Sequence, residues 1–173
     1  MYMDIETAEN RIYLAYGSNL NREQMAWRCP YARVLGPVEV PGYQLLFRGG
    51  NGGAVATIEP REGASVPALL WEITPRDEEA LDRYEGWPRL YRKESLTVHF
   101  GGADTGAMVY IMNDAPLGLP GAGYLGTILE GYKAAGFDPL VLDAAVKAST
   151  PARGGKWAVP PPNERLPRPI RWW

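Results

Sequence analysis

The chain of 173 residues is poor in the side chains that bind zinc and form disulfides, because it contains one cysteine, Cys29, and one histidine, His99. A single cysteine excludes an intrachain disulfide, which fits a reducing compartment. Zinc sites built from His and Cys are excluded too, although a magnesium site made only of carboxylates stays open. A Ser-His-Asp triad would need His99, which strand alternation places on the polar face shared by Ser95 and Thr97. We therefore expect His99 to face solvent, and we predict neither a metal nor a cofactor.

The sequence also lacks an excess of basic residues and any long apolar run. Its formal net charge is −2 and 22% of its residues are charged, so no global positive field would attract nucleic acid or an anionic membrane. No stretch of about 18 consecutive apolar residues is present, and residues 1–10 do not form a signal peptide. We predict a cytoplasmic protein that binds neither nucleic acid nor membrane, with a short disordered lead over residues 1–10.

Hydrophobic patterning and turn residues predict many short strands and a few helices. The expected strands cover residues 11–16, 34–40, 43–48, 54–59, 66–73, 93–100 and 107–113. Pro41-Gly42 and residues 60–64 are taken as turns, and the Gly-rich residues 49–53 as a hairpin tip. The expected helices cover residues 21–29, 74–86, 123–135 and 138–148, the last with Asp138 as N-cap. This pattern predicts an α+β fold with a small mixed β-barrel flanked by helices.

The composition changes after residue 149, so we divide the chain into a domain over residues 1–149 and a C-terminal extension over residues 150–173. The extension is rich in proline and holds Trp157, Trp172 and Trp173. Proline at this density is incompatible with helix or sheet core. We expect the extension to pack on the domain in extended form, and the alternative is a tail that binds a partner or another subunit.

One apolar strand breaks sharply into a helix near the N-terminus, at Tyr13-Leu14-Ala15-Tyr16-Gly17-Ser18-Asn19-Leu20. A strand that ends at Gly-Ser-Asn in front of a helix leaves backbone N–H groups without partners, and such groups favour a carboxylate or phosphate. The alternative is an ordinary strand-to-helix turn in which Asn19 or Asn21 is the N-cap.

The strongest helix signal lies about 60 residues later. Thr74 is the expected N-cap, Pro75 occupies the first helical position, and Gly86 follows the last turn as a C-cap. Glu85 therefore lies at the carboxyl end of this helix, where the dipole disfavours a carboxylate and tends to raise its pKa. The alternative is a solvated surface glutamate.

These two stretches together resemble the gamma-glutamylcyclotransferase-like family, which includes the AIG2-type proteins. The resemblance covers roughly residues 11–148. The matching segments are Tyr16-Gly17-Ser18-Asn19-Leu20, Gly53-Ala54-Val55-Ala56-Thr57-Ile58, Leu70-Trp71-Glu72-Ile73, Leu81-Asp82-Arg83-Tyr84-Glu85-Gly86 and Tyr124-Leu125.

The resemblance implies an intramolecular acyl transfer in which the alpha-amine of a gamma-glutamyl substrate attacks its own side-chain carbonyl. The products are 5-oxoproline and a free amine or amino acid. Glu85 would be the general acid and base. The implied substrate-binding residues are Tyr13, Leu14, Ala15, Tyr16, Gly17, Ser18, Asn19 and Tyr124. Tyr91, five residues past Gly86, is a further candidate as a wall or hydroxyl donor, and the alternative is that it packs in the core.

Three functional classes stay open at this stage. A gamma-glutamylcyclotransferase-like enzyme would act on a small gamma-glutamyl compound, whose leaving group the sequence does not specify. A non-catalytic small-molecule binding protein would use the same pocket without turnover. An interaction protein would act through the Pro/Trp-rich extension, and a homo-oligomer is compatible with each class.

Overall fold

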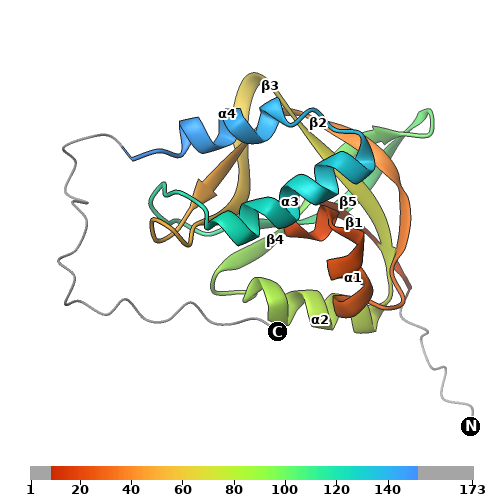
Figure 1. The fold of residues 1–173 in the computed structure, drawn as a ribbon. Helices are drawn as coiled ribbons and strands as arrows, with labels where there is room; N and C mark the ends of the chain where they lie inside the picture. The colour runs from red at the N-terminus through yellow and green to blue at the C-terminus, as the bar shows by residue number, and fades with distance from the viewer. Residues whose placement is uncertain (1–8, 152–173) are drawn as a thin grey trace, which may run out of the picture.

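Strand β1 (Arg11–Ala15) lies in the middle of a five-stranded mixed sheet in the order β2-β3-β1-β5-β4. The computed structural model describes residues 9–151. β1 pairs antiparallel with β3 and parallel with β5, and its last three residues are buried. The α+β class and the mixed character of the sheet are thereby confirmed. The helices lie around the curved sheet, and α3 is drawn between α4 and α2 in Figure 1.

Strands β2 (Arg33–Arg48) and β3 (Val55–Ile73) are each one long strand, where the sequence had suggested pairs of short strands. They form one antiparallel ribbon, and the Gly-rich tip connects them as predicted. The two expected turns were wrong, because the chain does not reverse there. Instead the register shifts between Pro41 and Tyr43, opposite Pro60 to Ser65. Proline lacks an N–H group and is tolerated at such irregularities, so these residues bend the ribbon without ending it.

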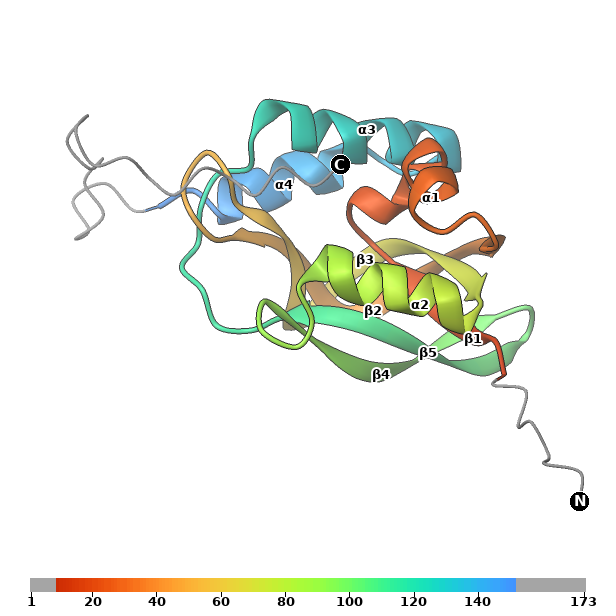
Figure 2. The same ribbon diagram turned by 90° about the horizontal axis from the view of Figure 1, so that it is seen from below.

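The predicted closed barrel is not found among residues 9–151. The hydrogen-bonded ladders end at β2 on one side and at β4 (Tyr91–Phe100) on the other. The two edge strands nevertheless approach closely, since a Cβ placed on Gly36 would lie 3.0 Å from the ring of Phe100. The sheet is thus curled almost onto itself, and it is held at this seam by side chains (Figure 2).

Strand β5 (Ala103–Met112) pairs antiparallel with β4. Its six residues from Ala107 to Met112 are all buried, in keeping with their unbroken apolar run. The side chain of His99 on β4 is 71% exposed beside Asp104, so the expectation that it faces solvent is also confirmed.

The four helices begin and end close to the predicted positions. Their bounds are α1 (Arg22–Arg28), α2 (Pro75–Glu85), α3 (Ala122–Ala135) and α4 (Leu140–Ala148), and a short 3₁₀ turn, η1 (Ser18–Leu20), precedes α1. The prediction for the start of α4 was wrong by one residue, because Pro139 is the N-cap. The carboxylate of Asp138 still accepts a hydrogen bond from the N–H of Leu140 at 3.0 Å.

Helix α3 supports the turn that follows β1. A Cβ on Gly131 would lie 2.7 Å from Cβ of Leu20, so only glycine lets the helix approach η1 this closely. Asn21 caps α1 by accepting from the N–H of Gln24 at 3.1 Å, and its Nδ2 donates to the carbonyl of Thr127 at 3.1 Å. One side chain therefore begins α1 and joins it to α3.

The expected lead over residues 1–10 lies almost entirely outside the described residues, and so does the C-terminal extension after residue 151. Within residues 9–151, no helix has the length and apolar character needed to cross a bilayer.

Candidate active site

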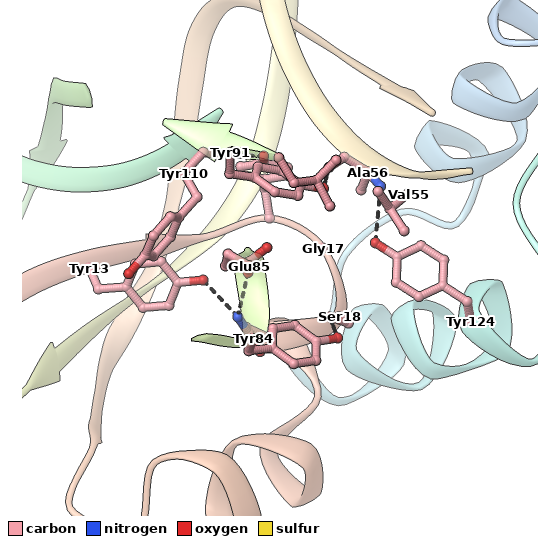
Figure 3. A pocket seen from close by; sticks show the side chains of 13 residues that line it. Tyr13, Gly17, Ser18, Val55, Ala56, Tyr84, Glu85, Tyr91, Tyr110 and Tyr124 are labelled. Carbon is pink, nitrogen blue, oxygen red and sulfur yellow. Dashed lines mark hydrogen bonds between the residues drawn. The ribbon is translucent and has the colours of Figure 1, made fainter. Parts of the chain in front are cut away.

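A cavity of about 120 Å³ opens where the end of β1, the carboxyl end of α2 and strands β3, β4 and β5 meet (Figure 3). Glu85 is the charged side chain among its lining residues, and most of the other walls are tyrosines and small apolar groups. The lining residues are Tyr13, Tyr16, Gly17, Ser18, Asn19, Val55, Ala56, Tyr84, Glu85, Leu90, Tyr91, Tyr110 and Tyr124. Segments more than 100 residues apart in sequence thus line one pocket.

The Gly-Ser-Asn turn forms one wall of this cavity. Gly17 packs closely against β3, because an added Cβ would lie 3.2 Å from Cβ of Ala56. Ser18 Oγ lies 2.8 Å from the Tyr84 hydroxyl, which joins the turn to α2. The alternative reading of this turn is half right, since Asn21 is the N-cap of α1. Asn19 is not a cap, and its side chain lines the cavity and donates to Glu85.

Glu85 contacts the turn directly. Its Oε1 accepts a hydrogen bond from Asn19 Nδ2 at 3.2 Å, and the same Nδ2 donates to the Tyr13 hydroxyl at 2.9 Å (Figure 3). Burial raises the pKa of Glu85 to about 7, against the smaller opposing effects of Arg28 and the Asn19 hydrogen bond. A carboxyl group with this pKa exchanges a proton near neutral pH, so it can both accept and donate one.

The tyrosines form walls whose hydroxyls are already engaged. Tyr91 donates to the carbonyl of Ala56 at 2.6 Å, and the N–H of Ala56 donates to the Tyr124 hydroxyl at 3.0 Å. Tyr16 donates to the carbonyl of Tyr110 at 2.5 Å. Burial raises the pKa of each of these phenols, so they stay neutral. For Tyr91, whose role the sequence left open, this geometry favours a wall.

Two of the residues expected to bind substrate lie elsewhere. Leu14 and Ala15 are buried in the core between neighbouring strands and do not line the cavity. The other expected residues, Tyr13, Tyr16, Gly17, Ser18, Asn19, Glu85, Tyr91 and Tyr124, all line it. Among residues 9–151, no group of three His, Cys, Asp or Glu side chains is arranged to hold a metal ion.

Sequence reasoning missed several residues of the site. Tyr84 belongs to a segment that matches the family but was not named as a site residue, yet it lines the cavity next to Glu85. Tyr110 lies on a strand whose apolar run gave no signal of function. Arg28 was not considered, although it lies on the helix that begins directly after the Gly-Ser-Asn turn, nine residues from Asn19, to which its guanidinium donates a hydrogen bond.

Comparison with known proteins gives a consistent result. The sequence signature of the family described as "Gamma-glutamyl cyclotransferase, AIG2-like" matches residues 13–125. A solved gamma-glutamyl cyclotransferase is 27% identical, with a TM-score of 0.71, over 84% of this chain and 90% of the other. No curated protein matches the sequence.

More distant structures share the fold. An AIG2-like protein from Mus musculus is 20% identical, with a TM-score of 0.52, over 60% of this chain and 78% of its own. A yeast gamma-glutamyl cyclotransferase specific to glutathione is 14% identical, with a TM-score of 0.55, over 82% of this chain and 97% of its own.

Proposed function

The chain belongs to the AIG2-like gamma-glutamyl cyclotransferase family, and we propose that it cyclises the gamma-glutamyl group of a small substrate with Glu85 as general acid and base. The products would be 5-oxoproline and a free amine or amino acid. The attacking amine belongs to the substrate itself, so the protein does not have to supply a nucleophile. The protein has to hold the substrate folded and move protons, and tethered, well-oriented reactants can lower a barrier by about 7–11 kcal/mol.

Two proton transfers would pass through one carboxyl group. The alpha-ammonium of the substrate loses a proton to the Glu85 carboxylate, and the free amine attacks the gamma-carbonyl carbon. The new C–N bond closes a five-membered ring as a tetrahedral intermediate. The protonated Glu85 then donates its proton to the leaving nitrogen, the old C–N bond breaks, and the carboxylate is restored. The second proton of the ring nitrogen passes to the released amine, which departs as an ammonium, so that 5-oxoproline keeps one ring N–H.

The observation that carries this proposal is the setting of Glu85. It is the charged side chain of the cavity lining, and its pKa of about 7 lies near the value at which one group serves best as both acid and base. A protein that only bound the alpha-ammonium of a gamma-glutamyl group would be served best by a carboxylate that stays ionised at neutral pH, whereas burial holds the pKa of Glu85 near 7. The setting therefore supports an enzyme over a binding protein.

The size and walls of the cavity support a small reacting group. About 120 Å³ corresponds to the liquid volume of roughly four water molecules. This space suits a single glutamyl group, and the leaving part of the substrate would then extend past the mouth, where Leu90 is 42% exposed. We propose that Tyr13, Tyr16, Gly17, Ser18, Asn19, Tyr91 and Tyr124 contact the glutamyl group.

The Gly-Ser-Asn turn supplies backbone N–H donors for the negative charge of the bound substrate. The first N–H groups of η1 lack intrahelical partners, and the N–H groups of Ser18 and Asn19 have no acceptor within residues 9–151. Such donors would bind the alpha-carboxylate of the substrate or the oxyanion of the tetrahedral intermediate.

The test is release of 5-oxoproline from a panel of gamma-glutamyl compounds, which should include glutathione, gamma-glutamyl amino acids and gamma-glutamyl-epsilon-lysine. Wild type is compared with Glu85→Gln and with Glu79→Gln, an exposed glutamate on the same helix. We expect at least about a 100-fold loss in kcat/KM for Glu85→Gln and none for Glu79→Gln.

The best member of the panel would identify the substrate. If the folded wild type releases 5-oxoproline from no compound, the proposed activity is refuted. The same panel would then be tested for binding by calorimetry, which detects a ligand that is held without turnover.

A further inference from the structure

Arg28, on helix α1, lies behind the cavity wall, outside the set of lining residues. Its guanidinium carbon lies 3.3 Å from the centre of the Tyr84 ring, in a cation–π arrangement. Its Nη1 donates to Oδ1 of Asn19, and its Nη2 donates to Oε1 of Gln24 at 3.1 Å. Arg28 is thus separated from the space available to substrate by Tyr84, and the lining residues that it contacts are Tyr84, through its ring, and Asn19, through Oδ1.

Asn19 connects this cation to the carboxyl group. Its Oδ1 accepts from Arg28 on one side, and its Nδ2 donates to Glu85 Oε1 and to the Tyr13 hydroxyl on the other. A guanidinium can only donate hydrogen bonds, and an ionised carboxylate can only accept them. Rotating the amide by half a turn would place NH₂ against the guanidinium and an oxygen against the carboxylate. The two partners therefore permit one orientation of the Asn19 amide.

This restraint has a consequence for the proton on Glu85. While Arg28 holds Oδ1, the Nδ2 group of Asn19 faces Oε1 whether Glu85 is ionised or protonated. Because Oε1 already accepts a hydrogen bond in both states, the other oxygen is the better site for the proton. Oε2 accepts no hydrogen bond from any of residues 9–151, so it is the oxygen that is free to carry it.

We infer that Arg28 is a positioning residue whose guanidinium fixes the Asn19 amide so that Oε2 of Glu85 is the oxygen that takes up and releases the catalytic proton. The catalytic use of this proton rests on the proposed function, but the positioning of the Asn19 amide by Arg28 does not require turnover. The residue that would touch substrate is Glu85, and Arg28 acts on it from behind.

The electrostatic surroundings agree with this assignment. The other titratable side chains near Glu85 are the tyrosines of the cavity, which come from β1, β4, β5, α3 and its own helix: Tyr13, Tyr16, Tyr84, Tyr91, Tyr110 and Tyr124. One turn before Glu85 on α2, Asp82 is held by Lys93 and by the Tyr110 hydroxyl. Arg28 is the cation that lowers the pKa of Glu85 against the effect of burial, so its removal should raise that pKa.

The test is an NMR titration of Glu85 in protein labelled with ¹³C at the glutamate carboxyl carbons, whose signal is assigned by its disappearance in Glu85→Gln. The variants are Arg28→Met, Arg28→Lys and the matched control Arg22→Met. Arg22 is an exposed arginine of the same helix with no hydrogen bond or ion pair within residues 9–151. Arg28→Met should raise the pKa of Glu85 by about one unit or more, and Arg22→Met should leave it unchanged.

Arg28→Lys separates charge from geometry, because lysine keeps the cation but lacks the planar pair of donors. We expect it to raise the pKa by less than the methionine variant. If Arg28→Met does not fold, a titration of Arg28→Lys identical to wild type overturns the inference, and a rise supports it. An unchanged titration in folded Arg28→Met overturns it directly.

Where the wild type turns over a substrate, the same variants give a second readout. The acid limb of kcat/KM should move to higher pH in Arg28→Met, and kcat should fall more than KM rises. If neither the wild type nor any variant releases 5-oxoproline, the proposed function is refuted. The titration of Glu85 still decides the role of Arg28 in that case.

Discussion

The two ends of helix α2 each hold a carboxylate, and the two are used in opposite ways. At the amino end, the buried Asp77 accepts hydrogen bonds from the N–H and hydroxyl of Thr74 at 3.0 and 2.9 Å. The Thr74 hydroxyl accepts from the N–H of Asp77 in return, which completes a capping box. At the carboxyl end, Glu85 has one hydrogen bond, from Asn19, and faces the cavity.

The dipole of the helix favours a carboxylate at the amino end and disfavours one at the carboxyl end. Asp77 is therefore stabilised by its own helix through Thr74, and its Oδ1 also accepts from the N–H of Tyr31 at 3.4 Å. Glu85 lies where both burial and the dipole disfavour its charge, and only distant residues oppose this effect. Asp77 is thus a carboxylate that stabilises the fold, whereas Glu85 is one that lies in the cavity at some loss of stability.

The largest expected effect is the dependence of stability on pH at the carboxyl end. The pKa of Glu85 is raised from 4.5 to about 7 in the folded protein, so the folded state binds more protons than the unfolded state between these values. The free energy of unfolding should fall as pH rises through this window, by up to about 3 kcal/mol at 1.36 kcal/mol per unit. Glu85→Gln removes this loss, so its stability relative to wild type should increase between pH 5 and pH 8.

Urea unfolding at both pH values measures this difference, with Glu79→Gln as the control that should follow wild type. A Glu85→Gln variant whose advantage is the same at pH 5 and pH 8 would show that Glu85 is not destabilised in the folded protein.

A smaller effect is expected at the amino end. Asp77→Ala removes a buried acceptor and leaves the N–H of Thr74 without its partner, which should reduce the free energy of unfolding by about 2 kcal/mol. Because Asp77 does not line the cavity, kcat/KM should stay within about twofold of wild type. Thermal unfolding and 5-oxoproline release measure the two quantities. A large loss of activity in a stable variant would contradict the structural role assigned to Asp77.

The smallest effect concerns the residue that ends the helix next to Glu85. Gly86 has φ of 65°, and an added Cβ would lie 3.2 Å from Cβ of Leu90, so Gly86→Ala should cost about 1 kcal/mol. Gly136→Ala is a matched control, because Gly136 ends α3 with φ of 75° and has open space around it. Both variants should lose similar stability, and only Gly86→Ala should also lose activity. Equal activity in the two would show that the αL cap does not help to position Glu85.

Local signals in the sequence predicted the parts of the fold that depend on near neighbours. The capping residues Thr74 and Asn21 and the C-caps Gly86 and Gly136 were all recognisable, because each acts within a few residues of its own helix. The long ribbon of β2 and β3 was not recognised, because Pro41-Gly42 has the same composition in a turn and in a bulge. Only the pairing of Pro41 with Ser65 and of Tyr43 with Pro60 distinguishes the two cases.

The candidate site divides in the same way. The paired motifs around Gly17 and Glu85 contributed residues to the cavity lining, but they also included Leu14 and Ala15, which are buried in the core and do not line it. Tyr84, Tyr110 and Arg28 were missed, since an apolar strand or an exposed helix gives no local sign that a distant carboxyl group lies beside it.

The sequence by itself determined the helix ends, the break of β1 at Gly17 and the position of Glu85 at the unfavourable end of a helix. These features follow from backbone geometry, hydrogen bonding and the helix dipole over a few residues. The tertiary structure alone decided that Asn19 meets Glu85 across 66 residues, and that Arg28 holds Asn19. Burial, which raises the pKa of Glu85 to about 7, is a property of the assembled cavity, so the chemistry of that carboxyl group exists only in the folded chain.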